Sequence, residues 1–260
     1  MRRRTAPRAE SMPALNPSAA FVIIGNEILS GRTQDVNLAF LGRRLAEAGV
    51  SLDEARVVAD ETSAIVNAVN ELRARHRYVF TSGGIGPTHD DITTASIAAA
   101  FGVAVIRHPD AVARLRRYYL TDDLSDARLR MADVPQGATL IDNPVSAAPG
   151  YRLDNVYVFA GVPRILQAMF ETIVGELAGG PPIRAAQVAA LIRESTIAAA
   201  LEEVQHRHDR VAIGSYPFQR AGVIGTTLVV RSADAAALDA AFRDVQALVD
   251  ATGAPQVDPL

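Results

Sequence analysis

The chain has 260 residues and a formal net charge of −3 at neutral pH, from 26 basic and 29 acidic side chains. Hydrophobic residues make up 49% and charged residues 21% of the sequence, a balance that is typical of folded globular proteins and excludes wholesale disorder. Because no strong net charge attracts polyanions, we expect neither a nucleic acid nor a membrane as a partner.

Two absent residue types exclude several kinds of chemistry. The sequence contains no cysteine, which rules out disulfides, thiolate catalysis, thiolate zinc sites and iron–sulfur clusters. It also contains no lysine, which rules out Schiff-base chemistry and the lysine-dependent phosphate sites of P-loop proteins and kinases. We attribute the lysine-free usage to a compositional bias of the source rather than to function.

The N-terminal segment, residues 1–18, is rich in arginine and proline. It lacks the apolar core of a secretory signal, and no stretch of about 18 apolar residues occurs in the sequence. We therefore predict a disordered tail on a soluble, cytoplasmic protein.

Strand-like and helix-like segments alternate through the first part of the chain. Asn37 is placed to cap the first helix, Gly49 to end it, and Thr62 to cap the next. Repeated strand–helix–strand order favours right-handed crossovers and a mainly parallel sheet that is covered on both faces. We predict an α/β domain over residues 19–178. Its predicted strands are residues 21–24, 52–59, 78–80, 103–106 and 156–159, and its predicted helices include residues 38–48, 91–101 and 163–177.

A second domain is predicted after the linker-like run Gly-Gly-Pro-Pro at residues 179–182. The segments that follow it read as strand, helix, strand, strand and helix, which is typical of a small α+β domain. We place this domain at residues 183–253. Its predicted elements are strands 186–192, 211–213 and 222–230 and helices 194–204 and 238–249.

A glycine-rich loop follows the predicted strand 78–80 and precedes the helix 91–101. In open α/β sheets, ligands bind in the crevice beyond the carboxyl ends of the strands. Its three glycines allow the backbone to approach a ligand closely, and the helix start offers free N–H groups and a positive dipole end. The loop therefore predicts a phosphate site. It is neither a Walker A loop nor a G-x-G-x-x-G motif, which weakens the kinase and dehydrogenase interpretations.

Two carboxylates, Asp90 and Asp91, follow this loop and would repel a phosphate. A divalent cation resolves the conflict, because Mg²⁺ binds one or two carboxylates together with phosphate oxygens and water. Such a cation would neutralise the charge that develops in phosphoryl chemistry. The alternative for either aspartate is a helix N-cap. His89 is interpreted as a solvated loop residue rather than a metal ligand.

The sequence Ser-Gly-Gly-Ile-Gly-Pro-Thr-His-Asp-Asp-Ile-Thr at residues 82–93 resembles a known signature. It is similar to that of the molybdopterin-binding domain found in MoaB/Mog-type cofactor-biosynthesis proteins, in the N-terminal part of CinA and in FAD synthases. The resemblance covers roughly residues 20–250. Further matches lie at residues 25–31, Asp35, Asn37, Asp60, 143–150, 161–163 and 213–217. Departures from the family pattern occur at Ser146, Ala147, Ala160, Arg164 and Ile165.

The resemblance implies a three-layer α/β/α fold, a homo-oligomer (dimer or trimer) and a pterin or nucleotide ligand that carries phosphates. Mog-like members use the acidic residues that align with Asp91 and Asp60 in Mg²⁺-dependent adenylyl transfer to molybdopterin. CinA-like members are associated instead with metal-dependent hydrolysis of the ADP-ribose pyrophosphate. Both reactions attack a nucleotide pyrophosphate.

These arguments define a set of candidate site residues. Catalytic roles fall to Asp91 and Asp60, and metal binding to Asp91 and Asp90, with Mg²⁺ or another divalent cation as cofactor. Molybdopterin or an adenine nucleotide is the expected ligand. The residues predicted to bind or support it are Ser82, Gly83, Gly84, Gly86, Thr88, Thr93 and Glu27.

Several alternatives remain open. A non-catalytic ligand-binding or scaffold protein that retains the fold is the main one, and FAD synthesis is a weaker one. Asn37 is interpreted as a cap rather than a ligand contact. Arg114, Arg116 and Arg117 are interpreted as a solvated helix face, with phosphate binding as the alternative. Ser82 has no recognisable His/Asp triad, which makes serine hydrolase chemistry unexpected.

Overall fold

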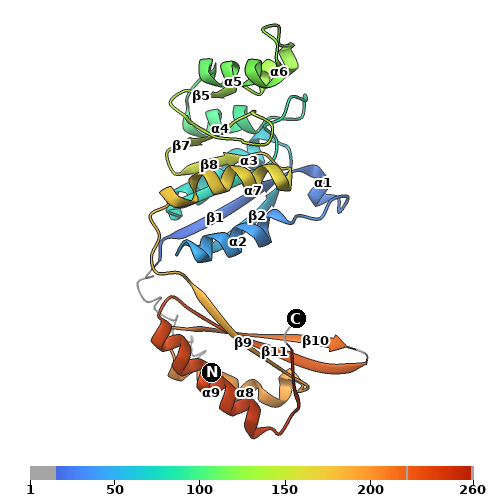
Figure 1. Cartoon of the computed structure of the whole chain (residues 1–260), viewed down its shortest axis with the longest axis vertical. Coiled ribbons are helices and arrows are strands. Elements are labelled where there is room, and N and C mark those ends of the chain that lie inside the picture. Colours follow the sequence, from blue (N-terminus) through green and yellow to red (C-terminus); the bar gives the residue numbers. More distant parts are fainter. Residues whose placement is uncertain (1–15, 221, 259–260) are drawn as a thin grey trace, which may run out of the picture. The chain divides into compact units, whose positions relative to one another are not determined.

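The computed structural model of the chain describes residues 16–220 and 222–258 (Figure 1). These residues divide into two units. The first comprises residues up to Leu38 together with Leu52–Ala178, and the second comprises Ala39–Ser51 together with the residues from Gly179 onward. The domain boundaries expected from the sequence, 19–178 and 183–253, stay a prediction.

A six-stranded sheet forms the centre of the first unit. The inner strands β1 (Ser18–Ile24), β3 (Tyr78–Ser82) and β8 (Val156–Phe159) run parallel, as predicted. Strands β7 (Gly150–Leu153) and β6 (Thr139–Ile141) add an antiparallel hairpin that we did not predict. The strand order is β2 (Ser51–Val58), β1, β3, β8, β7, β6.

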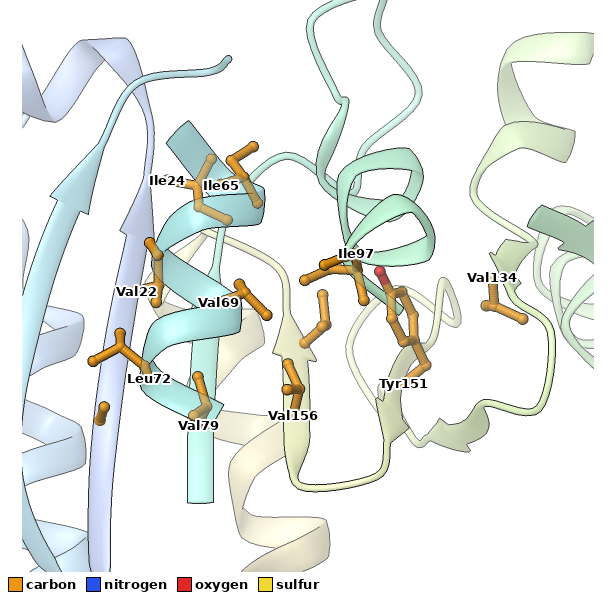
Figure 2. Close-up of a cluster of buried hydrophobic side chains, with 14 residues drawn as sticks. Val22, Ile24, Ile65, Val69, Leu72, Val79, Ile97, Val134, Tyr151 and Val156 are labelled. Atoms are coloured by element: carbon orange, nitrogen blue, oxygen red, sulfur yellow. The ribbon is translucent and has the colours of Figure 1, made fainter. Parts of the chain in front are cut away.

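Alternate side chains of each strand point to opposite faces of this sheet. Both faces therefore carry apolar side chains, and helices cover both of them. Val79 and Val158 pack with α3 (Thr62–Arg75) and α4 (Thr93–Phe101) in a buried cluster (Figure 2). Phe80 and Phe159 point to the other face, where their rings contact Phe170 of α7 (Pro163–Ile173). The predicted α/β fold with a mainly parallel sheet is therefore confirmed, in the form of a mixed sheet.

Further regular elements lie between residues 105 and 135, where the sequence predicted only the strand 103–106 and a helix face around Arg114. They enclose a small buried cluster that includes Ala111, Leu115 and Leu124. These elements are β4 (Val105–Arg107), α5 (Pro109–Tyr119), α6 (Asp126–Arg130) and β5 (Asp133–Pro135), with β4 and β5 paired antiparallel. The unit also contains α1 (Asn26–Leu29) and a 3₁₀ turn (Val174–Glu176), while α2 (Asn37–Glu47) falls mostly in the second unit.

The part of the second unit after Gly179 is an antiparallel sheet with two helices, which confirms the predicted α+β class. Its strand order is β10, β11, β9, β12, and every pairing is antiparallel. Side chains of β9, β11, α8 and α9 form its hydrophobic core. The elements are β9 (Arg184–Ala190), α8 (Glu194–Arg207), β10 (Ala212–Arg220), β11 (Val223–Ser232), α9 (Ala235–Ala251) and β12 (Gln256–Val257).

Predicted helix caps differ from the observed ones. Asn37 is the first residue of α2, and the Asp35 carboxylate accepts the Leu38 N–H at 2.8 Å instead. Thr62 is likewise the first residue of α3, whose N-cap makes no side-chain bond. The prediction that Asn37 and Thr62 are caps was therefore wrong: the Asn37 amide bonds to the Gly161 carbonyl, and Glu61 is the N-cap of α3.

The predicted N-terminal tail, residues 1–18, lies outside the described residues up to position 15, and Ser18 already belongs to β1. In the described part of the chain, no helix is long and apolar enough to cross a membrane.

Candidate functional site

A crevice is expected where adjacent strands send their helices to opposite faces of the sheet. Strands β3 and β8 are parallel neighbours, and the helices that follow them, α4 and α7, lie on opposite faces. The Gly83 N–H donates to the Phe159 carbonyl at 3.2 Å, so the pairing extends to the very end of both strands. The glycine loop therefore begins at a ligand-binding position of the fold.

Gly83 is the residue at which three strand ends converge. It adopts φ +99°, and a Cβ placed on it would lie 2.2 Å from the carbonyl oxygen of Ile24, which ends β1. A Cβ placed on Gly161, just beyond β8, would lie 3.2 Å from the Gly83 Cα. Only glycine fits at position 83, because any side chain would displace the end of the neighbouring strand.

Thr93 holds the loop in place from the first turn of α4. Its buried hydroxyl donates to the Gly83 carbonyl and its N–H donates to the Gly84 carbonyl, both at 2.9 Å. Gly84 also has a positive φ of +67°, and a Cβ there would lie 2.2 Å from the Thr93 hydroxyl oxygen. Thr93 is thus a support of the loop.

The loop leaves a set of backbone donors available at its centre. Among the described residues, no hydrogen bond engages the N–H groups of Gly84, Ile85 and Gly86. These residues are partly exposed, and α4 presents the positive end of its dipole beside them. Neighbouring free N–H groups next to a helix start are the arrangement that binds phosphate oxygens.

The two aspartates of the loop converge on one hydroxyl group. The Thr88 Oγ1 lies 2.5 Å from Asp90 Oδ1 and 2.6 Å from Asp91 Oδ2, and Asp91 Oδ2 also accepts the Thr88 N–H at 2.7 Å. A hydroxyl has one hydrogen to donate, so Thr88 can satisfy only one of the two carboxylates at a time. The hydrogen bond from Thr88 also lowers the pKa of Asp90, because it stabilises the ionised carboxylate.

This donor set fits a cation that is completed by the ligand. Within the described ranges, no three histidine, aspartate or glutamate side chains gather as a protein-only metal site. Mg²⁺ does not need one, because it binds one or two carboxylates together with phosphate oxygens and water. Asp90 and Asp91 are exposed or partly exposed beside the free N–H groups, and they share a single hydroxyl hydrogen. Both aspartates precede the Ile92 N-cap of α4, so neither caps it.

Asp60 and Glu27 lie around the end of β1 and not in the glycine loop. The Asp60 Oδ2 accepts the Asn26 N–H at 2.8 Å, which ties the end of β2 to the start of α1. The Glu27 carboxylate folds back over Gly25, where an added Cβ would lie 2.6 Å from it. Since β2 and β3 flank β1 on opposite sides, Asp60 and Asp91 lie at the same sheet edge but come from strands that are not neighbours.

Asn37 and Ser82 contribute polar groups at the same sheet edge. Asn37 is 3% exposed, and its side-chain amide donates to the Gly161 carbonyl at 2.9 Å. Its Oδ1 is buried with no hydrogen-bond partner in the described structure. Ser82 ends β3 and is buried, and no hydrogen bond among the described residues engages its hydroxyl. A buried acceptor without a donor calls for an explanation such as a ligand group or a bound water.

Sequence reasoning missed one further residue at the loop. Arg130, at the end of α6, donates from Nη2 to the Pro87 carbonyl at 2.7 Å. The only local signal for this helix was Ser125, the N-cap of α6, whose hydroxyl accepts a hydrogen bond from the Arg128 N–H. Because α6 is a five-residue helix, hydrophobic periodicity could not reveal it.

A separate cavity of about 540 Å³ lies between α5, the β6–β7 turn and α7. None of residues 82–93 lines it. Two arginines of α5 line this cavity and differ in their ion pairs. Arg114 pairs with Asp142 at 2.5 Å, while no ion pair in the described part of the chain engages Arg117. Its lining residues include Arg114, Arg117, Tyr118, Asn143 and Ala147.

Comparison with known families agrees with this geometry. Residues 20–179 match the family model described as a "Probable molybdopterin binding domain", and residues 182–257 match that of the "FAD synthase, middle domain". Because the first match covers more than half of the chain, the chain belongs to the molybdopterin-binding domain family. It combines this domain with a segment that matches the middle domain of FAD synthases.

Individual relatives extend over most of the chain. A protein of Aeropyrum pernix is 35% identical over 225 residues, which cover 82% of this chain and 83% of that protein. A protein of Pyrococcus horikoshii is 34% identical over 214 residues, or 76% of this chain and 84% of that protein. The crystal structure of the protein CinA from Thermoplasma acidophilum, described as of unknown function, is 34% identical with a TM-score of 0.59. It covers 62% of this chain and 97% of that chain.

Proposed function

We propose that this chain binds a molybdopterin or an adenine nucleotide by its phosphates and acts on the pyrophosphate with a divalent cation. The products would be those of adenylyl transfer to molybdopterin or of ADP-ribose pyrophosphate hydrolysis. The observation that carries the proposal is the placement of the free N–H groups of Gly84, Ile85 and Gly86 beside two carboxylates that share one hydroxyl hydrogen.

Some loop residues would bind the phosphate oxygens, and others would hold the cation that neutralises the phosphate charge. The N–H groups of residues 84–86 and the first turn of α4 would hold phosphate oxygens, and Ser82 and Thr88 would add hydroxyl groups. Gly83 and Thr93 keep the loop in the required shape. A bound Mg²⁺ would neutralise phosphate charge, and Asp91 with Asp90 would hold it. From the end of β1, Asp60 would take part in catalysis and Glu27 would contact the ligand.

Nucleotide turnover tests the proposal directly. The full chain is incubated with ADP-ribose or, separately, with ATP plus molybdopterin, each with Mg²⁺, Mn²⁺ or Co²⁺, and products are separated by chromatography. We expect turnover in one of the two reactions and a loss of at least about 100-fold in Asp91→Asn, because the substitution removes the charge that holds the cation. Asp53→Asn, at an exposed position of β2, serves as the matched control. Turnover that is unchanged in Asp91→Asn contradicts the assignment.

Binding without turnover is the second candidate function. It is favoured by the bonds that Asp60 and Asp91 already make, since Asn26 and Thr88 occupy one oxygen of each carboxylate. Saturable binding of the same ligands, with no product under any of the three cations, would support this candidate against the first.

We also propose that the chain acts as a cytoplasmic homo-oligomer, a dimer or a trimer. Sedimentation velocity of the full chain tests the assembly, and a single monomeric species over the micromolar range would contradict it.

A further inference from the structure

Arg130 brings a positive charge to a loop that otherwise carries negative side chains. Its guanidinium donates to the carbonyl of Pro87, which lies between Gly86 and Thr88. Asp90 and Asp91 follow within the same turn, yet neither forms an ion pair with Arg130 in the described part of the chain. The arginine is therefore held at the loop by a neutral backbone group, and its charge is not neutralised there.

The geometry of a guanidinium leaves most of its donors available. An arginine carries five N–H donors in a planar fork, and the structure engages one of them, through Nη2 at 2.7 Å from the Pro87 oxygen. The planar fork is pre-organised, so less conformational entropy is lost for each hydrogen bond that the remaining donors form with a ligand. Arginine forks match phosphate geometry, and such charge-assisted hydrogen bonds are about twice as strong as neutral ones.

We propose that Arg130 binds a phosphate oxygen of the ligand that the glycine loop holds. The inference rests on the proposed function and deepens it, because it names the side chain that offsets the loop carboxylates before a cation arrives. In a chain without lysine, this role falls to an arginine, and Arg130 reaches the loop from a helix 43 positions further along the sequence.

A purely structural role for Arg130 makes a different prediction. If the side chain only clamps the Pro87 carbonyl, glutamine can replace it, because the glutamine amide also donates but carries no charge. If it binds phosphate, Arg130→Gln loses affinity for charged ligands while Arg130→Lys keeps part of it. Arg128 of the same helix is the matched control, since its guanidinium lies 3.8 Å from the ring centroid of Tyr119 and not at the loop.

The experiment is isothermal titration of the full chain with ADP-ribose, ATP, pyrophosphate and adenosine, each with and without Mg²⁺ and at two salt concentrations. We expect Arg130→Gln to weaken ADP-ribose binding about 10- to 100-fold and to flatten its salt dependence. Adenosine binding and Arg128→Gln should be unchanged, and circular dichroism melting should show that both variants are folded.

The outcomes separate the two proposals. ADP-ribose affinity that is equal in Arg130→Gln and the unsubstituted chain overturns the role of Arg130 and leaves the proposed function standing. An equal loss for ADP-ribose and adenosine assigns Arg130 a clamping role and also overturns the inference. If the unsubstituted chain binds neither ADP-ribose nor ATP nor pyrophosphate under any condition, the proposed function fails and this inference fails with it.

Discussion

Gly83 and Ile24 lie so close that a methyl group on the glycine would be 2.2 Å from the Ile24 carbonyl oxygen. The contact joins the ends of two parallel strands, β1 and β3, at the edge where the glycine loop begins. A backbone that approaches another backbone this closely leaves no room for a side chain. The shape of the candidate phosphate site therefore depends on the absence of a Cβ at this position.

Gly83→Ala should be strongly destabilising for this reason. Two costs add: about 1–2 kcal/mol for a non-glycine residue at positive φ, and about 1–3 kcal/mol for displacing the Ile24 carbonyl. Gly31→Ala is the matched control, because Gly31 has φ +73° and nothing within 4 Å of an added Cβ. Urea unfolding measures both variants, and equal losses of unfolding free energy would show that the Ile24 contact does not matter.

Thr88 should set the pKa of Asp90, because its hydroxyl is the main cause of the lowered value. In Thr88→Val the hydroxyl is lost, so the pKa of Asp90 should rise toward that of an ordinary aspartate, whereas Thr88→Ser should keep it low. A carbon-detected NMR titration of the side-chain carboxyl groups follows this pKa. An Asp90 pKa that is the same in Thr88→Val and Thr88→Ser would rule out the shared hydroxyl.

Asn37→Leu should lower the free energy of unfolding by about 1–2 kcal/mol, because it removes the only side chain in the described structure that donates to the Gly161 carbonyl. Asn67→Leu, at an exposed position of α3, should change it by less than about 0.5 kcal/mol. Chemical denaturation compares the two. A loss in Asn37→Leu no larger than in Asn67→Leu would mean that this hydrogen bond contributes nothing.

Acid should weaken the second unit through Asp234, the N-cap of α9. The N–H of Ala237 is the main cause that lowers the pKa of this carboxyl, with Arg210 and the Ala236 N–H assisting. A carboxyl whose pKa is lower in the folded state than in the unfolded state adds its full stabilisation at pH values above the unfolded-state pKa of about 3.9. This stabilisation disappears as the pH falls through the lower pKa of the folded state.

Asp234→Asn isolates this effect, because asparagine keeps an acceptor for the helix start but does not titrate in this range. Melting temperatures are measured for both proteins from pH 7 down to pH 2. The unsubstituted chain should have the higher melting temperature at neutral pH, and the difference should disappear below about pH 4. A gap that is constant over the whole pH range would exclude the charge of Asp234 as its cause.

The core architecture was predictable because its signals are local. Buried strands such as Val156–Phe159 are short apolar runs in the sequence, and Pro163 indicates the start of α7 because proline is common at the first position of a helix. The glycine loop was predictable for the same reason, since its glycines and aspartates are consecutive in the sequence. The hairpin of β6 and β7 was not predicted, because its strands are three and four residues long and carry polar side chains such as Arg152.

The remaining site residues depend on contacts that are distant in the sequence. Asn37 looked like a cap because its partner, Gly161, lies 124 positions away. Arg130 meets Pro87 across 43 positions, from a helix too short to show a periodic pattern. Local propensity cannot reveal either contact, because the fold and not the neighbouring sequence creates it.

In the function proposed above, the N–H groups of Gly84, Ile85 and Gly86 bind the phosphates of the ligand. The most direct measurement is a ¹H–¹⁵N correlation titration of the labelled full chain with pyrophosphate and with ADP-ribose, each in the presence of Mg²⁺. We expect these three amides and the first turn of α4 to show the largest saturable shifts. Shifts confined to the cavity around Tyr118 and Asn143, with the three loop amides unmoved at saturation, would contradict it.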